Sequence, residues 1–426
     1  MKAQQFARAR FFAFSFSTAL ILTAAVPRLS ASDSEGSSCT SIAAAPQAAP
    51  GIHELEESGG AQFCAGREGN LGSESKADPL GTLRREAEHG NPAAQNELGY
   101  AYAHGEGVTQ DDKEAVRWYR AGAEQDLPTA QYNLASMYEQ GHGAPRDELE
   151  AAQWYLRAAE QGFAPAQTHL AVLYRDGRGV PRDPTEAVKW FRAAAAQGTA
   201  AAEESIGRAY YLGLGVSRNY VEARRWFEKA AAHGVIEAYR DLGLIYETGK
   251  GVHSDPAKAA EVYRKAAEGG LAVAQVDLGR MYMDGRGVPR DYSLAERWFR
   301  KAADQGDARG QNSLGCLYSL GRGLARDYRR AVEWFRRAAE RGNANSESNL
   351  GVLYQNGWGV GLDYVEAYKW YALAAEHGHS LSRNAIQSLT QIMTTAQLEE
   401  GQKRRALWLA EHRIPTASTL ADGKVE

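Results

Sequence analysis

The chain has 426 residues, a formal net charge of −4 and 24% charged residues. This balance gives no concentrated basic face, so it argues against a nucleic-acid partner. The three cysteines are too few for a disulfide scaffold and match no zinc motif, and we expect neither a metal nor another cofactor.

The first 31 residues are typical of a secretory signal peptide. Lys2, Arg8 and Arg10 form a basic start, and residues 11–26 are largely apolar. The apolar run is too short and too interrupted for a membrane-spanning helix. We expect cleavage after Ala31, a periplasmic or secreted location, and no membrane insertion after cleavage. An uncleaved anchor is the alternative.

Residues 32–79 are predicted to be a disordered linker. Ser, Gly, Ala and Glu dominate this stretch, and its apolar content is too low to offset the entropy of ordering. Cys39 and Cys64 both lie in it. In an oxidising compartment they could form a disulfide. Two unpaired thiols are the alternative, and spacing alone does not decide between them.

A 36-residue pattern then recurs eight times without a gap from residue 91 to residue 378. Each copy carries Leu or Ile followed four residues later by Tyr, a spacing that places both on one face of a helix. Two glycines end that helix, because Gly accepts a positive φ at little cost. The aliphatic positions are Leu98, Leu134, Leu170, Ile206, Leu242, Leu278, Leu314 and Leu350.

A second helix follows in each copy. Asp183 is predicted to be an N-cap, Pro184 suits the first helical position, and Glu186 completes a capping box. The second helix carries an apolar stripe of Ala, Trp and Tyr or Phe, and we expect the recurring Trp and Tyr residues in the core. The loop arginines, such as Arg178, Arg182, Arg286 and Arg290, are expected to be solvated, with a basic rim that binds acidic partners as the alternative.

One repeat cannot stand alone. It buries about five large apolar side chains, or about 10 kcal/mol, whereas ordering its residues costs about 1–2 kcal/mol each. Neighbouring repeats must therefore stack, which predicts an all-α fold: a right-handed α/α superhelical solenoid. The solenoid is expected over residues 80–378, with residues 80–90 as a capping helix. Residues 379–411 are predicted to form two further capping helices, 380–393 and 395–410, before a disordered tail at 412–426.

The assembled pattern resembles the Sel-1-like repeat, a relative of the tetratricopeptide repeat, over residues 80–378. The resemblance implies a helical repeat fold and a binding role, because such proteins are similar to adaptor modules that assemble complexes. It does not choose a partner. The third repeat shows the motif nearly whole, in Ala166, Gln167, Leu170, Ala171, Tyr174, Gly177, Gly179, Val180, Asp183, Ala187, Trp190, Phe191, Ala194, Ala195 and Gly198.

Function is expected where the eight copies differ. On the first helix these positions lie two before the recurring Leu, and two, five and six after it. By analogy with tetratricopeptide arrays they line a concave groove, and simple exposure is the alternative. Arg, Tyr and Met are enriched in interface cores, so the groove suits a peptide or a partner helix. The candidates are Asn96, Tyr100, Tyr132, Ser136, Glu139, Arg175, Glu204, Arg208, Tyr211, Arg240, Glu247, Arg280, Met283 and Asn312.

These observations predict a non-enzymatic scaffold or adaptor that binds a protein or peptide and regulates an envelope or signalling complex. The alternative is an envelope enzyme of the β-lactamase-like or peptidoglycan-acting type. No catalytic motif supports it, and relatives reported to handle β-lactams carry paired cysteines that this chain lacks. Cys316 is expected to be a small filler residue, with a partly exposed groove thiol as the alternative. His377 and His379 are expected at the surface. The sequence does not predict an oligomeric state.

Overall fold

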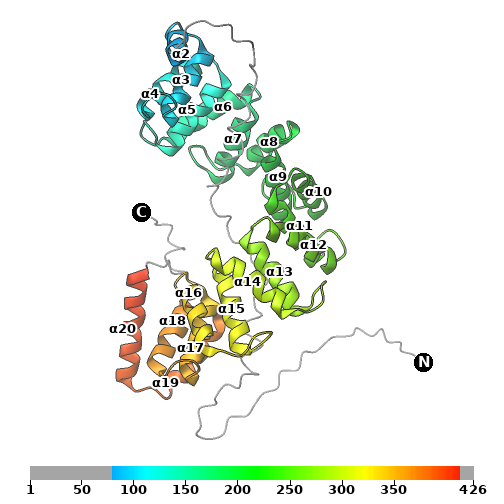
Figure 1. The fold of residues 1–426 in the computed structure, drawn as a ribbon, viewed down its shortest axis with the longest axis vertical. Helices are drawn as coiled ribbons and strands as arrows, with labels where there is room; N and C mark the ends of the chain where they lie inside the picture. The colour runs from blue at the N-terminus through cyan, green and yellow to red at the C-terminus, as the bar shows by residue number, and fades with distance from the viewer. Residues whose placement is uncertain (1–78, 413–426) are drawn as a thin grey trace, which may run out of the picture.

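The computed structural model describes residues 79–412, and within them every regular element is a helix. From α2 to α19, each helix packs against the next one in the chain, and the pairs follow a curved path (Figure 1). The predicted all-α solenoid is confirmed. The helices are α2 (Pro79–Glu88), α3 (Pro92–His104), α4 (Asp112–Ala123), α5 (Pro128–Gln140), α6 (Glu148–Glu160), α7 (Ala164–Asp176), α8 (Pro184–Ala196), α9 (Ala200–Leu212), α10 (Tyr220–Ala232), α11 (Ile236–Thr248), α12 (Pro256–Glu268), α13 (Ala272–Asp284), α14 (Tyr292–Asp304), α15 (Ala308–Leu320), α16 (Tyr328–Ala339), α17 (Ala344–Asn356), α18 (Tyr364–Glu376), α19 (Ser380–Thr390) and α20 (Thr395–His412).

The second helices begin at the predicted N-caps. The Asp183 carboxylate accepts hydrogen bonds from the backbone N–H groups of Thr185 and Glu186, at 2.9 and 3.0 Å. A complete capping box would also have the N–H of Asp183 donate to the Glu186 carboxylate. This part of the prediction is wrong, because that N–H donates to the Tyr174 carbonyl at 2.8 Å. The Glu186 carboxylate pairs with Lys189 at 2.6 Å. Each N-cap thus also ties the second helix to the first.

The two loop glycines have different roles. Gly177 ends α7 with φ of +74°, which suits a left-handed helix cap. Gly179 also has a positive φ, and a Cβ there would lie 1.9 Å from the Glu148 carbonyl oxygen at the start of α6. The loop of one repeat therefore packs directly on the second helix of the repeat before it, at a distance that admits only glycine.

The core is built from the recurring Leu and from the Tyr or Phe of the second helix. Leu98, Tyr155 and Phe299 are fully buried. The expectation that every Trp belongs to the core is wrong in part: Trp154 and Trp370 are buried, but the other five lie half-buried. A Lys or Arg side chain lies over the ring of four of these five. These contacts include Lys229 over Trp226 (5.2 Å), Lys301 over Trp298 (4.4 Å) and Arg337 over Trp334 (4.6 Å).

Both ends of the array are covered by extra helices. At the start, Leu80 and Leu83 of α2 pack on the first repeat. At the other end, Trp408 of α20 packs on Trp370 with ring centroids 4.8 Å apart, and Arg404 pairs with Glu366 at 2.9 Å. Among residues 79–412, no helix is both long enough and apolar enough to span a membrane. The expected signal peptide, linker and tail lie outside the described residues, apart from the borders at 79 and 412.

Candidate partner-binding groove

The first helices of the repeats form the inner side of the curve. Successive first helices contact one another, as in α3 with α5, α13 with α15 and α15 with α17. Second helices in the described part of the chain make no comparable contact with each other. Elements on the inside of a curved array lie closest together, which is why we assign the first helices to the inner side; the groove itself stays a prediction.

A polar ladder joins neighbouring repeats along this inner face. The residue two before the recurring Leu contacts the residue one before the Leu of the next repeat. The pairs are Asn133 Nδ2 to Asn96 Oδ1 (2.8 Å), Tyr132 Oη with His169 Nε2 (3.1 Å), and Arg240 Nε to Asp277 Oδ2 (3.2 Å). The sequence prediction selected the residue two before the Leu in each pair (Asn96, Tyr132 and Arg240) and missed its contact in the next repeat. The missed positions also vary between copies and carry polar side chains, which is the signal that could have found them.

A second ladder uses the residue five after the recurring Leu. This residue contacts the side chain between the two loop glycines of the next repeat. The pairs are Arg178 with Glu139 (3.0 Å), Lys250 with Tyr211 (3.0 Å) and Arg286 with Glu247 (2.9 Å). The expectation that Arg178 and Arg286 are merely solvated is therefore wrong, because each forms an ion pair with an acidic residue of the preceding repeat.

The contacts of Glu139 stabilise the ionised form of its carboxylate. Tyr155 donates to its carboxylate at 2.8 Å, and His169 lies 3.7 Å away. Burial raises the pKa of Glu139, but the hydrogen bonds from His169 and Tyr155, with the charges of His169 and Arg178, lower it to about 2. The residue is therefore ionised at neutral pH and serves as an inter-repeat anchor.

The middle of the groove holds a compact cluster of acids and arginines. Arg208 Nε lies 3.2 Å from Asp241 Oδ2 and also pairs with Glu204. Burial raises the pKa of Glu204 to about 7, with Arg208 opposing this and Asp241 adding to it. Burial likewise raises the pKa of Asp241 and of Asp277, against the neighbouring arginines. The cluster presents little unpaired charge to a partner.

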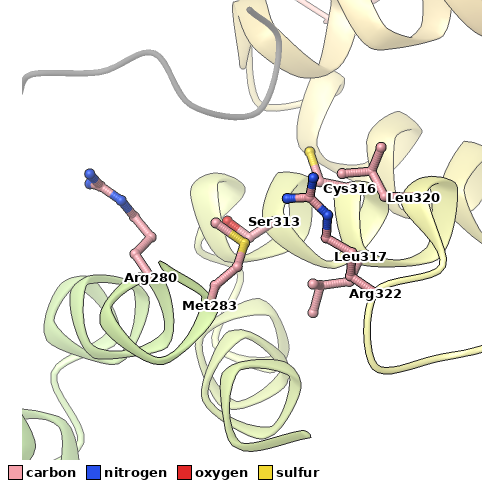
Figure 2. A pocket seen from close by; sticks show the side chains of 7 residues that line it. All are labelled: Arg280, Met283, Ser313, Cys316, Leu317, Leu320 and Arg322. Carbon is pink, nitrogen blue, oxygen red and sulfur yellow. The ribbon is translucent and has the colours of Figure 1, made fainter. Parts of the chain in front are cut away.

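The predicted residues that leave part of their surface accessible on the inner face include Tyr100, Ser136, Arg175, Arg280 and Met283. Tyr100 is 40% exposed and stacks on His104 at a centroid distance of 4.0 Å. Arg175 is half-buried and pairs with the adjacent Asp176 at 2.7 Å. Arg280 and Met283 are half-buried and line a pocket between α13 and α15 (Figure 2). Ser136 is half-buried and accepts a hydrogen bond from Gln140 at 3.2 Å.

The same pocket contains Cys316, which differs from both expectations. It is 1% exposed, so it is not a partly exposed thiol, and it is disulfide-bonded, so it is not a simple filler. Asn312 also differs from an accessible groove residue. The Asn312 side chain is buried. Its Oδ1 accepts hydrogen bonds from Ser346 at 2.8 Å and from Asn349 at 3.2 Å. The residues that line the pocket are Arg280, Met283, Ser313, Cys316, Leu317, Leu320 and Arg322.

Several other expectations bear on reactive groups. His377 is not a surface residue: its side chain is 8% exposed, and Nδ1 lies 2.9 Å from the fully buried carboxylate of Glu347. Within residues 79–412, no three His, Cys, Asp or Glu side chains gather in a way that could hold a metal ion. The possible Cys39–Cys64 pair lies outside the described residues.

Comparison with known proteins gives the family. The Sel1 repeat model matches eight consecutive segments, 92–127, 128–163, 164–199, 200–235, 236–271, 272–307, 308–343 and 344–379. These segments cover more than half of the chain, so the chain belongs to the Sel1 repeat family.

Two solved structures show the likeness in detail. One is c5321, a protective antigen present in uropathogenic Escherichia coli strains that displays an SLR fold. It is 28% identical with a TM-score of 0.50, over 84% of this chain and 98% of that chain. The other, a Sel1 repeat protein from Oxalobacter formigenes, is 35% identical with a TM-score of 0.53, over 57% of this chain and 96% of that chain. No curated protein matches the sequence.

Proposed function

We propose that this Sel1 repeat protein is a non-enzymatic scaffold that binds a protein partner along the inner face of its solenoid. Sel1 repeat proteins are generally protein-interaction scaffolds. The observation that carries the proposal is the row of accessible, non-repeating side chains on the first helices. Tyr100, Arg175, Arg280 and Met283 lie on this row, and they belong to residue types enriched at interface cores.

The ladders between repeats support binding at this face. Ion pairs such as Arg178–Glu139 and Arg240–Asp277 already hold neighbouring groove side chains in place. Few further side chains therefore lose conformational freedom when a partner binds. A preorganised surface loses less entropy on association. The row extends across several repeats, so it suits an extended peptide or a partner helix, with Tyr100 and Met283 as apolar anchors.

We propose a periplasmic or secreted location, and regulation of an envelope or signalling complex as the role there. The signal-like residues 1–31 support export. The disulfide at Cys316 is typical of proteins from oxidising compartments. A fusion of residues 1–31 to a reporter that functions only outside the cytoplasm tests the location. Reporter activity that stays cytoplasmic would refute it.

Photo-cross-linking in intact cells tests the groove itself. A photoreactive amino acid is placed at Tyr100 or Arg175, each on a first helix. The matched control is Leu149, which is 57% exposed on the second helix α6. We expect one identified protein to be captured from the groove positions and not from Leu149. Equal capture at Leu149, or no capture at any groove position, would contradict binding through the inner face.

A further inference from the structure

The disulfide at Cys316 points to an intramolecular partner for one part of the groove. The sequence holds only two other cysteines, Cys39 and Cys64, and both precede α2. We infer that the leader, defined as residues 32–78, docks on the inner face at α13 and α15 and is held there by a Cys39–Cys316 disulfide. The pocket between these two helices is the docking site (Figure 2).

The length of the leader favours Cys39 over Cys64. Six repeats separate α3 from α15, and contacting helices lie about 8–10 Å apart, so the inner path measures roughly 50–60 Å. A fully extended chain covers at most about 3.5 Å per residue. Cys64, about 15 residues before α2, would need a straight chain with no slack. Cys39, about 40 residues before α2, has more than twice the required reach.

Charge also matches the leader to this site. The leader contains eight acidic residues and two basic ones. Asp33 and Glu35 lie close to Cys39 in the sequence. Arg280 and Arg322 line the pocket that contains Cys316. An acidic segment anchored at Cys316 therefore lies next to two guanidinium groups, which favours docking over repulsion.

The surroundings of Cys316 hold its sulfur in a fixed place. The side-chain amides of Asn312 and Asn349 each donate to Sγ at 3.9 Å.

Formation of the Cys39–Cys316 disulfide needs an oxidant, and we propose a protein disulfide of the oxidising compartment for this role. The Cys39 thiolate attacks that disulfide and releases one thiol. The Cys316 thiolate then attacks the Cys39 sulfur and releases the second thiol, so the oxidant gains the two electrons that the cysteine pair loses.

The bond has a consequence for the groove. With the leader in place, Arg280 and Met283 face this chain's own segment, and another ligand must displace it to reach them. A cysteine forms one disulfide at a time, so this arrangement also excludes the Cys39–Cys64 pair. The inference rests on the proposed oxidising location but not on the proposed binding partner, because it concerns contacts within one chain.

Disulfide mapping of the purified secreted chain tests the pairing. Free thiols are first alkylated, and the chain is then cut without reduction after acidic and basic residues. Cleavage after Glu54 and Glu57 separates the Cys39 peptide from the Cys64 peptide, and cleavage after Arg309 and Arg322 releases Cys316. We expect Cys39 linked to Cys316 and Cys64 alkylated. A Cys39–Cys64 or Cys64–Cys316 link, or three alkylated cysteines, would overturn the inference.

Hydrogen exchange tests the docking separately from the bond. The variant Cys39→Ser leaves the solenoid sequence untouched, and Cys64→Ser is its matched control. We expect loss of amide protection at α13 and α15 in Cys39→Ser, with unchanged exchange at α5 and α7 and no change in Cys64→Ser. Identical exchange at α13 and α15 in all three proteins would show that the leader does not dock there.

Discussion

At the scale of single residues, the protonation of Glu204 should affect the stability of this fold near neutral pH. Burial raises its pKa to about 7, from 4.5. The folded state therefore binds the Glu204 proton more tightly than the unfolded state does. The contribution of Glu204 to the free energy of unfolding is therefore fully present below pH 4.5 and is lost as the pH rises through 7. A shift of this size corresponds to about 3 kcal/mol.

We expect Glu204→Gln to flatten the pH dependence of the free energy of unfolding between pH 5 and pH 8. The amide cannot ionise, so the loss of stability on raising the pH shrinks. Chemical denaturation across this range measures it. Glu139→Gln is the control: its pKa of about 2 keeps the wild-type residue ionised throughout, so that variant should shift stability equally at every pH. Equal slopes for wild type and Glu204→Gln would contradict the assignment.

At the scale of the elements, the loop contact between repeats requires glycine. A Cβ at Gly179 would lie 1.9 Å from the Glu148 carbonyl oxygen, whereas one at Gly162 meets nothing within 4 Å. Both glycines have positive φ, so both Gly→Ala variants lose about 1–2 kcal/mol from the backbone. We expect Gly179→Ala to lose at least about 2 kcal/mol more, because backbone must move. Thermal unfolding of the two variants measures the difference, and equal losses would exclude the clash.

A side-chain contact between the first helix and the end of the second helix is made by Gln–Gln in some repeats and by Glu–His in others. In the third repeat, Gln197 donates to Gln167 at 2.9 Å. In the fourth repeat, His233 and the fully buried Glu203 occupy the same two positions, with Nδ1 and Oε2 2.7 Å apart. The eighth repeat uses His377 and Glu347 in the same way. In these two repeats both positions differ from the Gln–Gln pair, as expected for side chains that satisfy each other in a buried site.

This exchange can be tested with a double-mutant cycle. His233→Gln alone leaves the buried Glu203 carboxylate without its ring partner and should cost about 1–3 kcal/mol. Adding Glu203→Gln rebuilds the Gln–Gln pair of the third repeat and should recover most of that loss. Urea unfolding of the wild type, both single variants and the double variant gives the coupling energy. Additive losses would mean that the two positions do not act as a pair.

The sequence predicted the helices much better than the groove. The spacing of Leu98 and Tyr102 and the N-cap at Asp183 are local signals, so helix type and position follow from them. The partner of a groove side chain depends on which residue of the next repeat lies opposite. Only the structure therefore shows that Asp277 pairs with Arg240 and that Arg178 pairs with Glu139. The disulfide of Cys316 joins distant parts of the chain and leaves no local pattern to detect.

At the scale of the whole molecule, the solenoid should respond to damage locally. Each helix packs mainly on its neighbours in sequence, and such arrays behave as one-dimensional chains of coupled repeats. The cap α20 is the clearest case. It covers the 1% exposed Trp370 through Trp408, and a Cβ at Gly401 would meet the Tyr368 ring at 2.7 Å.

Removing residues 394–426 should therefore destabilise the last repeats and leave the first ones unchanged. The truncation exposes Trp370 and Tyr368, and uncovering a large apolar side chain costs about 1.5–3 kcal/mol. We expect faster amide exchange in α17 and α18 and wild-type exchange in α3 to α10. Removal of residues 413–426 alone is the matched control and should change neither region. Uniformly faster exchange along the array would mean that the solenoid unfolds as one cooperative unit, because a loss at one end would then be shared by every repeat.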